Sequence, residues 1–351
     1  MVPGAYRPAT SSCERVEHYT LDDRLSMSDR ELLVRINMDH APGRMGQLTP
    51  GGSLRWGRCR FDFNPEPGGR ADFAVVMGNA RPVDRFMVAP ENTLFIAAEP
   101  PTKKIYPKAF YRQFAHLVDT HGLSGHPAVE VTMPGLCWHA GLDRRTNTFS
   151  YGYDHLKSLH VPEKINRVSV VCSDAAFTPG QRLRLDFLRR LKAELGERLV
   201  HYGRGFEPID DKMTAILPNR FHLVMENSEV PNYWTEKLAD AYLGWAFPFY
   251  VGCPNLADFF PQNEFLRLDP RNADEAARLI IRMLDTEPSS EEMSSVESAR
   301  QRVLDTYNPF AWCARWVEKF HRDARETHVT MRSHKAYRSF PRGMIYRFKH
   351  P

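Results

Sequence analysis

Residues 167–173, "RVSVVCS", followed by residues 178–196, "TPGQRLRLDFLRRLKAELG", decide the fold class. The first segment is a short apolar run rich in valine, which is typical of a buried strand. The second repeats leucine and phenylalanine at helical spacing. Thr178 can cap this helix, Pro179 suits its first position, and Gly196 ends it. A strand followed at once by a helix predicts a parallel α/β sheet.

The same pattern extends along the chain in both directions. Because 351 residues exceed what one hydrophobic core usually supports, we expect two α/β domains of Rossmann type. Residues 40–58 are rich in glycine and proline and are predicted to form loops. The apolar runs that predict further strands are residues 31–37, 71–78, 84–89 and 92–99 upstream, and residues 198–203, 221–227 and 247–252 downstream. Helices are predicted to begin near Thr235, Asn272, Ser289 and Asn308.

Domain boundaries are predicted where this pattern breaks. We expect an N-terminal arm at residues 1–30 and a first domain at residues 31–160. Residues 140–162 are polar and irregular and are the candidate linker. The second domain is expected at residues 161–330, and a tail occupies residues 331–351.

Composition excludes several classes of protein. A net charge of +4 is too small and too evenly spread to predict a nucleic-acid partner. No apolar run approaches the roughly 18 residues of a membrane span, and the first residues do not resemble a secretory signal. The six cysteines lie far apart without a C-x-x-C pair, which argues against a zinc knuckle. Reduced thiols of this kind fit a cytoplasmic protein.

The tail is the exception to the even charge distribution. Residues 331–351 contain lysine and arginine without any acidic residue, interleaved with tyrosine and phenylalanine. Such a segment can lie on an anionic surface, which would place the protein at the inner face of a membrane. The alternative is a C-terminal segment that packs across the other domain. The sequence leaves both open.

A polar stretch, "ENSEVPNYWTEKL" at residues 226–238, directly follows the predicted strand at residues 221–227. Open α/β sheets bind ligands beyond the carboxyl ends of their strands. The helix expected near Thr235 would present N–H groups and Lys237 to a phosphate, and Glu236 could accept hydrogen bonds from ribose hydroxyls. This combination predicts a nucleotide site. The alternative is that Thr235 and Glu236 only cap the helix while Lys237 is a solvated charge.

Residues 225–270, "MENSEVPNYWTEKLADAYLGWAFPFYVGCPNLADFFPQNEFLRLDP", resemble the signature of the family 10 glycosyltransferases, the α-1,3/α-1,4-fucosyltransferases. The resemblance implies a GT-B fold, in which two Rossmann-like domains face each other across a cleft. The matching positions of the motif are Glu226, Asn227, Ser228, Tyr233, Thr235, Glu236, Lys237, Pro248, Gly252, Pro261 and Phe265.

The resemblance also implies roles for individual residues. Arg184 would contact the donor phosphates, and Lys237 would be a second cation for them. Glu236 would be the carboxylate that binds the ribose. Asn227 and Tyr233 would be further donor contacts. The neighbouring Arg182 is an alternative to Arg184, and Asp174 is left out because it stands where the family commonly has asparagine.

The predicted catalytic residue is Glu99, in "LFIAAEPPTKK". It matches the glutamate regarded as the family's general base, and it also follows an apolar strand, where a carboxylate can face a substrate. A surface glutamate at a loop entry is the alternative for Glu99. His139 is the reserve candidate for the base.

The function implied by the resemblance is inverting transfer of L-fucose from GDP-fucose to a hydroxyl of a glycan or lipid-linked glycan. No Asp-x-Asp motif is present in the sequence, so no metal ligands and no cofactor are expected. Two alternatives remain: a different nucleotide sugar in the same fold, or a non-catalytic interaction protein that retains the fold. The loops at residues 38–70 and 103–160, expected to bind the acceptor, carry no readable motif.

Overall fold

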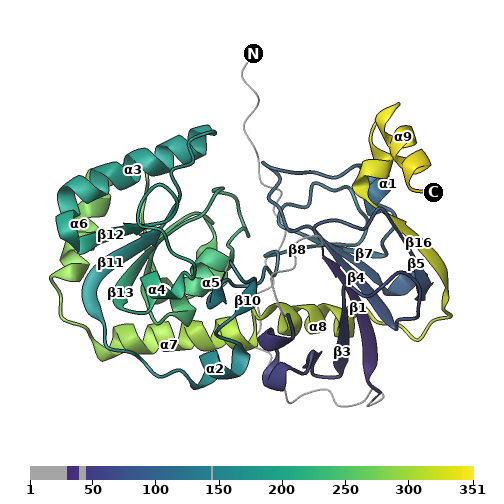
Figure 1. Cartoon of the computed structure of the whole chain (residues 1–351), viewed down its shortest axis with the longest axis horizontal. Helices are drawn as coiled ribbons and strands as arrows, with labels where there is room; N and C mark the ends of the chain where they lie inside the picture. Colours follow the sequence, from purple (N-terminus) through teal and green to yellow (C-terminus); the bar gives the residue numbers. More distant parts are fainter. Residues whose placement is uncertain (1–29, 39–44, 144) are drawn as a thin grey trace. The chain divides into compact units, whose positions relative to one another are not determined.

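The computed structural model describes residues 30–38, 45–143 and 145–351 (Figure 1). The arm predicted at residues 1–30 lies outside this range except for Arg30. Within the described residues, the chain forms two main sheets, one from each half.

The sheet of the N-terminal half has the strand order β2-β3-β1-β4-β6-β7-β8, and its neighbours are parallel except for the β2–β3 pair. Strand β2 lies inside the segment predicted to be loop. It forms because Trp56 turns back onto Cys59 through Gly57, which has a φ of +54°. The strands are β1 Leu32–Met38, β2 Arg55–Trp56, β3 Cys59–Phe63, β4 Phe73–Met77, β6 Thr93–Ile96, β7 His116–Asp119 and β8 Val129–Val131.

The strand predicted at residues 84–89 is present as β5, Val83–Val88, but it lies outside the parallel sheet. It pairs antiparallel with β16, Thr327–Arg332, in a separate two-stranded sheet. Buried and more exposed residues alternate along β5, because only one face of this strand is covered by the rest of the protein. On the covered side, the buried Asp84 carboxylate accepts hydrogen bonds from Arg35 and Asn37 of β1.

The sheet of the C-terminal half is parallel throughout, in the order β12-β11-β13-β14-β15. Helices α3 and α6 cover one face, and α5 and α7 cover the other (Figure 1). Two Rossmann-like α/β units are therefore confirmed, which are the units of the predicted GT-B fold. The elements are β11 Ile165–Val171, β12 Leu199–Tyr202, β13 Asn219–Met225, β14 Phe247–Val251, β15 Leu266–Arg267, α3 Pro179–Leu195, α5 Glu236–Leu243, α6 Ala273–Leu284 and α7 Ser290–Asp305.

The helices start where the sequence predicted them. Thr178 and Gln181 form a capping box at α3, and Asn272 and Ser289 accept N–H bonds at α6 and α7. Shorter elements connect the main ones. These are α1 Lys108–Tyr111, α2 Tyr153–Ser158, α4 Met213–Ile216, β9 Leu142–Asp143, β10 Thr148–Phe149, and the 3-10 helices Met45–Leu48, Pro50–Gly52, Pro90–Asn92, Gly196–Arg198, Leu256–Asp258, Gln262–Glu264 and His334–Tyr337.

Helix α8, Pro309–Phe320, packs on the N-terminal half although the predicted boundary places it in the second domain. Phe310 meets Phe61 edge-on, and Phe320 stacks on His116. Helix α8 packs there because it is apolar around most of its surface, so its aromatic and small side chains need a core to cover them. The N-terminal core therefore includes a late segment of the chain.

Residues 333–351 also contact the N-terminal half. His334 Nδ1 lies 2.6 Å from Asn79 Oδ1, and the Tyr337 ring contacts Phe110. Helix α9, Arg342–Lys349, nevertheless leaves Phe348 80% exposed, and the preceding Phe340 is 81% exposed. Among the described residues, no helix combines the length and apolar character needed to cross a membrane.

We predict that Asp84→Ala destabilises the protein by about 3–5 kcal/mol, because it leaves the buried Arg35 guanidinium without its counter-charge. Urea denaturation measures the change. Asp186→Ala removes an exposed partner of Arg189 on α3 and should cost less than about 1 kcal/mol. Equal losses for the two variants would contradict the structural role of Asp84.

Candidate active site

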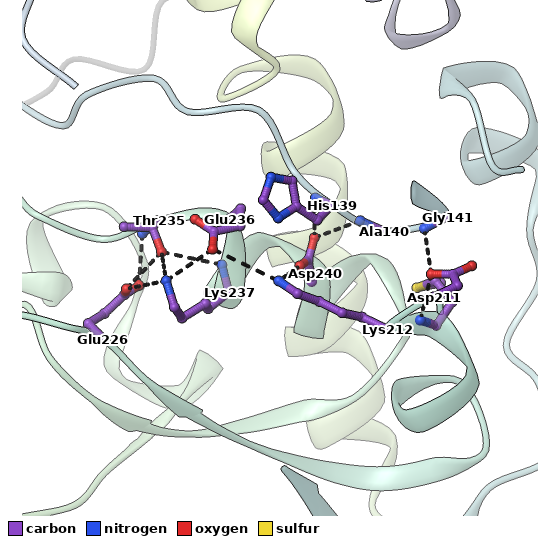
Figure 2. A network of polar contacts seen from close by, with 11 residues as sticks. His139, Ala140, Gly141, Asp211, Lys212, Glu226, Thr235, Glu236, Lys237 and Asp240 are labelled. Carbon is purple, nitrogen blue, oxygen red and sulfur yellow. Dashed lines mark hydrogen bonds and ion pairs between the residues drawn. The ribbon is translucent and has the colours of Figure 1, made fainter. Parts of the chain in front are cut away.

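The polar stretch predicted to bind a nucleotide lies between the end of β13 and the start of α5. Every residue of β13 is buried, so the strand is held in the sheet up to Met225 and the chain turns polar directly after it. Helix α5 begins at Glu236, with Thr235 as its N-cap. The carboxyl end of a parallel strand and a helix N-terminus are thus brought together (Figure 2).

Glu226 connects these two elements. Its buried carboxylate accepts the Thr235 N–H at 2.8 Å and the Thr235 hydroxyl at 2.7 Å. Gly252 makes room for it, because a Cβ at that position would lie 2.6 Å from the Glu226 Cγ atom. Both Glu226 and Gly252 are positions of the motif, but neither was assigned a role from the sequence. Their spacing in the motif was the available signal.

Lys237 is held between two carboxylates. Its Nζ lies 3.0 Å from Glu236 Oε1 and 3.4 Å from Glu226 Oε2, and it donates to the Thr235 hydroxyl at 3.0 Å. Although burial opposes both shifts, the charges of the pair lower the pKa of Glu236 and raise that of Lys237. The two residues are therefore charged together at neutral pH.

The start of α5 is less open than the sequence predicted. The N–H groups of Thr235 and Lys237 are already bound, by Glu226 and by the Thr235 hydroxyl. Thr235 caps the helix, as the alternative expected, but the carboxylate that supports the cap is Glu226 and not Glu236. Lys237 is not a solvated surface charge, because it lies inside the polar cluster.

A second carboxylate of α5 extends the cluster. Asp240 is fully buried and accepts a hydrogen bond from Lys212 at 2.6 Å. Its other oxygen accepts the backbone N–H groups of His139 and Ala140 (Figure 2). Sequence reasoning missed Lys212 and Asp240. The position of Asp240 four residues after Glu236, on the same helix face, was a usable signal for the latter.

Arg184 and Asn227, predicted as donor contacts from α3 and the end of β13, are in direct contact. The Arg184 guanidinium donates to the Asn227 side-chain oxygen at 2.8 Å. Arg182, the alternative, instead donates to the carbonyls of Ala176 and Phe177. The structure therefore places Arg184, and not Arg182, beside the polar stretch.

Tyr233 is buried between these groups. Burial, together with the charge of Glu226, raises the pKa of its phenol, so the hydroxyl is neutral at physiological pH. The charge of Glu99 adds to this effect. The predicted base and the predicted donor contact are thus within electrostatic range of each other.

Glu99 follows β6 by three residues, as predicted, and its carboxylate accepts a hydrogen bond from Lys103 at 2.6 Å. The same loop reaches the polar stretch, because the Thr102 hydroxyl lies 3.1 Å from the Ser228 hydroxyl. Among the described residues, no cluster of three His, Cys, Asp or Glu side chains could hold a metal ion.

We predict that Glu226→Gln destabilises the protein by about 1–3 kcal/mol, because an amide cannot accept hydrogen bonds at both positions that face Thr235 and Lys237. The midpoint of urea denaturation gives the change. The control is Glu229→Gln, which alters an exposed pair with Arg271 and should shift stability by less than about 1 kcal/mol. An unchanged midpoint for Glu226→Gln would show that this carboxylate does not hold the helix start.

Comparisons with known proteins agree with the motif. Residues 161–292 match the model of "Glycosyltransferase family 10 (fucosyltransferase) C-term". The "Alpha-(1,3)-fucosyltransferase FucT" of Helicobacter pylori is 32% identical over 92 residues, which are 26% of this chain and 19% of the relative. The chain is thus aligned with about a fifth of the length of this curated relative.

Solved structures similar to the chain include glycosyltransferases. An α1,3-fucosyltransferase with GDP-fucose is 15% identical, covering 82% of this chain and 94% of the other, with a TM-score of 0.43. WaaG, a glycosyltransferase of lipopolysaccharide biosynthesis, is 11% identical, covering 82% and 99%, with a TM-score of 0.41. Over residues 161–292 the chain is therefore similar to the C-terminal part of the family 10 glycosyltransferases, the family whose signature the motif resembles.

Proposed function

We propose that this protein transfers L-fucose from GDP-fucose to a hydroxyl of a glycan or lipid-linked glycan, with inversion at the anomeric carbon. The observation that carries the proposal is the cluster of Glu226, Thr235, Glu236 and Lys237, which lies inside the matched family region. The named activity of the H. pylori relative supports fucose as the transferred sugar.

Donor binding is assigned to the residues around this cluster. Arg184 contacts a neutral amide, so its positive charge can serve a phosphate. Lys237 already pairs with two carboxylates, so a phosphate would compete with them for its ammonium group. Glu236 would accept hydrogen bonds from the ribose, and Asn227 and Tyr233 would complete the site. These cations stabilise the charge that develops on the leaving diphosphate.

Glu99 is proposed as the general base. It removes the proton of the acceptor hydroxyl while that oxygen attacks the anomeric carbon opposite the diphosphate. One displacement of this kind inverts the configuration and needs no covalent sugar–enzyme intermediate. The contact between Thr102 and Ser228 supports this role, since it joins the Glu99 loop to the proposed donor site.

The remaining parts of the proposal concern donor choice and location. A different nucleotide sugar is the alternative donor, because no residue above reads guanine or the fucose methyl group. A cytoplasmic location rests on the spacing of the cysteines alone. Contact with an anionic membrane remains a proposal for α9, supported by exposed Phe340 and Phe348 beside Arg342, Arg347 and Lys349.

GDP should raise the melting temperature even in EDTA, because Arg184 and Lys237 supply the positive charge that a metal ion would otherwise provide. A larger shift with GDP than with UDP, CMP or ADP would favour GDP-fucose as the donor. Arg184→Gln should weaken GDP binding by about 1.5–3 kcal/mol, the usual contribution of a charge-assisted hydrogen bond. Calorimetric titration measures this change. Arg182→Gln is the matched control and should bind GDP with near-normal affinity. If no nucleotide shifts the melt, or if Arg182→Gln is the variant that loses affinity, the assignment fails.

Glu99→Gln should lower turnover of GDP-fucose with an acceptor by about 10²- to 10⁴-fold, the typical contribution of a general base. GDP affinity should stay unchanged, since Glu99 acts on the acceptor. Glu130→Gln, in an exposed pair with Lys319, is the control and should keep normal turnover. Near-normal transfer by Glu99→Gln would end its assignment as the base and make His139 the next residue to test.

A further inference from the structure

Three consecutive polar residues, at and just after the end of β7, carry buried side-chain atoms without a hydrogen-bond partner among the described residues. Asp119 and Thr120 are 0% and 3% exposed, and the His121 side chain is 6% exposed. Within the described residues, Thr120 Oγ1, His121 Nε2 and Asp119 Oδ2 have no hydrogen-bond partner. Buried polar atoms are nearly always paired, so three adjacent exceptions point to a missing ligand or water.

The tautomer of His121 follows from its neighbours. The backbone N–H of Leu123 donates to His121 Nδ1 at 2.8 Å, so Nδ1 carries no proton. Burial lowers the pKa of this imidazole, although the charge of Asp119 opposes the shift. The neutral ring must therefore carry its proton on Nε2. This buried N–H is a donor with no acceptor among the described residues.

The Thr120 side chain adds a hydroxyl beside the His121 N–H donor. A hydroxyl can donate one hydrogen bond and accept two, so it matches another hydroxyl in either direction. Asp119 keeps the segment in place, because its Oδ1 accepts the N–H groups of His121 and Gly122 at 2.9 and 2.6 Å. The two side chains are thus presented by a loop with a defined backbone.

The position of this segment relates it to the proposed reaction. Strand β7 pairs in parallel with β6, and Ile96 lies level with Val118. Glu99 follows the carboxyl end of β6, and Thr120 and His121 follow the carboxyl end of its neighbour β7, so both segments leave the same edge of the sheet. On the other side, Asn232, the neighbour of Tyr233, donates to the Thr120 carbonyl at 3.2 Å. The segment therefore contacts the proposed donor loop and follows the strand next to the one that leads to the proposed base.

We propose that the Thr120 hydroxyl and the His121 Nε2–H bind oxygens of the acceptor sugar and orient its attacking hydroxyl toward Glu99. The inference rests on the proposed function, and it names the acceptor-binding residues that the sequence did not reveal. The acceptor is favoured over the donor because both groups come from the N-terminal sheet, beside the strand that leads to the base. The proposed donor contacts come from α3 and from the β13–α5 segment.

The test uses two pairs of variants of the full chain. Thr120→Val removes the hydroxyl at nearly constant volume, and Thr120→Ser restores it. His121→Asn keeps a group near Nδ1 for the Leu123 N–H but removes the outer N–H, whereas His121→Gln returns an N–H near the Nε2 position. Ser124→Ala, which alters a buried hydroxyl that already accepts the His126 N–H, is the control.

Each variant is assayed for transfer from GDP-fucose to N-acetyllactosamine, N-acetylglucosamine and lactose, for GDP-fucose hydrolysis without acceptor, and for GDP affinity. Thr120→Val and His121→Asn should each raise the acceptor KM by about 3- to 10-fold, the value of one hydrogen bond. Hydrolysis and GDP affinity should not change, and Thr120→Ser and His121→Gln should recover most of the loss.

The outcomes separate the inference from the proposed function. If the wild-type protein transfers fucose but the acceptor KM of both Thr120→Val and His121→Asn stays normal, the inference is wrong. Lower melting temperatures without a change in KM would show that the two groups hold an internal water. If the wild-type protein neither hydrolyses GDP-fucose nor transfers from it, the proposed function fails first and the inference with it.

Discussion

The buried carboxylate of Glu226 is the interaction on which the site depends. It ends β13 and accepts both the backbone N–H and the hydroxyl of Thr235, so it determines where α5 begins. The helix start in turn sets the directions of Glu236 and Lys237 in its first turn, and of Asp240 one turn later. Burial raises the pKa of Glu226, and Lys237 opposes this shift. A charge placed so deep is tolerated because a cation and two hydrogen-bond donors surround it.

Charges in the site are mutually compensated. Lys237 lies between Glu226 and Glu236, and Lys212 lies between Glu236 and Asp240. This alternation reduces the electrostatic cost of burying several ionised groups in one place. The charge of Lys237 is shared between two carboxylates, whereas the guanidinium of Arg184 donates its hydrogen bond to the neutral amide of Asn227. Arg184 on α3 is therefore more available to an incoming anion than Lys237, which the motif alone did not indicate.

The N-terminal half is completed by the end of the chain. Helix α8 contributes to its core, and β16 pairs with β5, the strand that carries Asp84 of the buried Arg35–Asp84 ion pair. Near the site, the contact between Thr102 and Ser228 and the hydrogen bond from Asn232 to Thr120 join the halves. The groups proposed to act on the two substrates are thus brought together by loops that follow β6, β7 and β13.

The sequence by itself determined the parallel α/β class, the capped start of α3, and the strand-to-helix turn that carries Glu226 and Lys237. These features depend on residues close to one another in the chain, so apolar periodicity and capping residues are enough to predict them. Only the tertiary structure decided that β5 leaves the main sheet and that Arg184 meets Asn227. It alone also showed that Lys212 joins Asp240, and that Thr120 Oγ1 and His121 Nε2 are buried without a hydrogen-bond partner among the described residues. These facts depend on contacts between distant segments, and local patterns carry no information about which distant side chains meet.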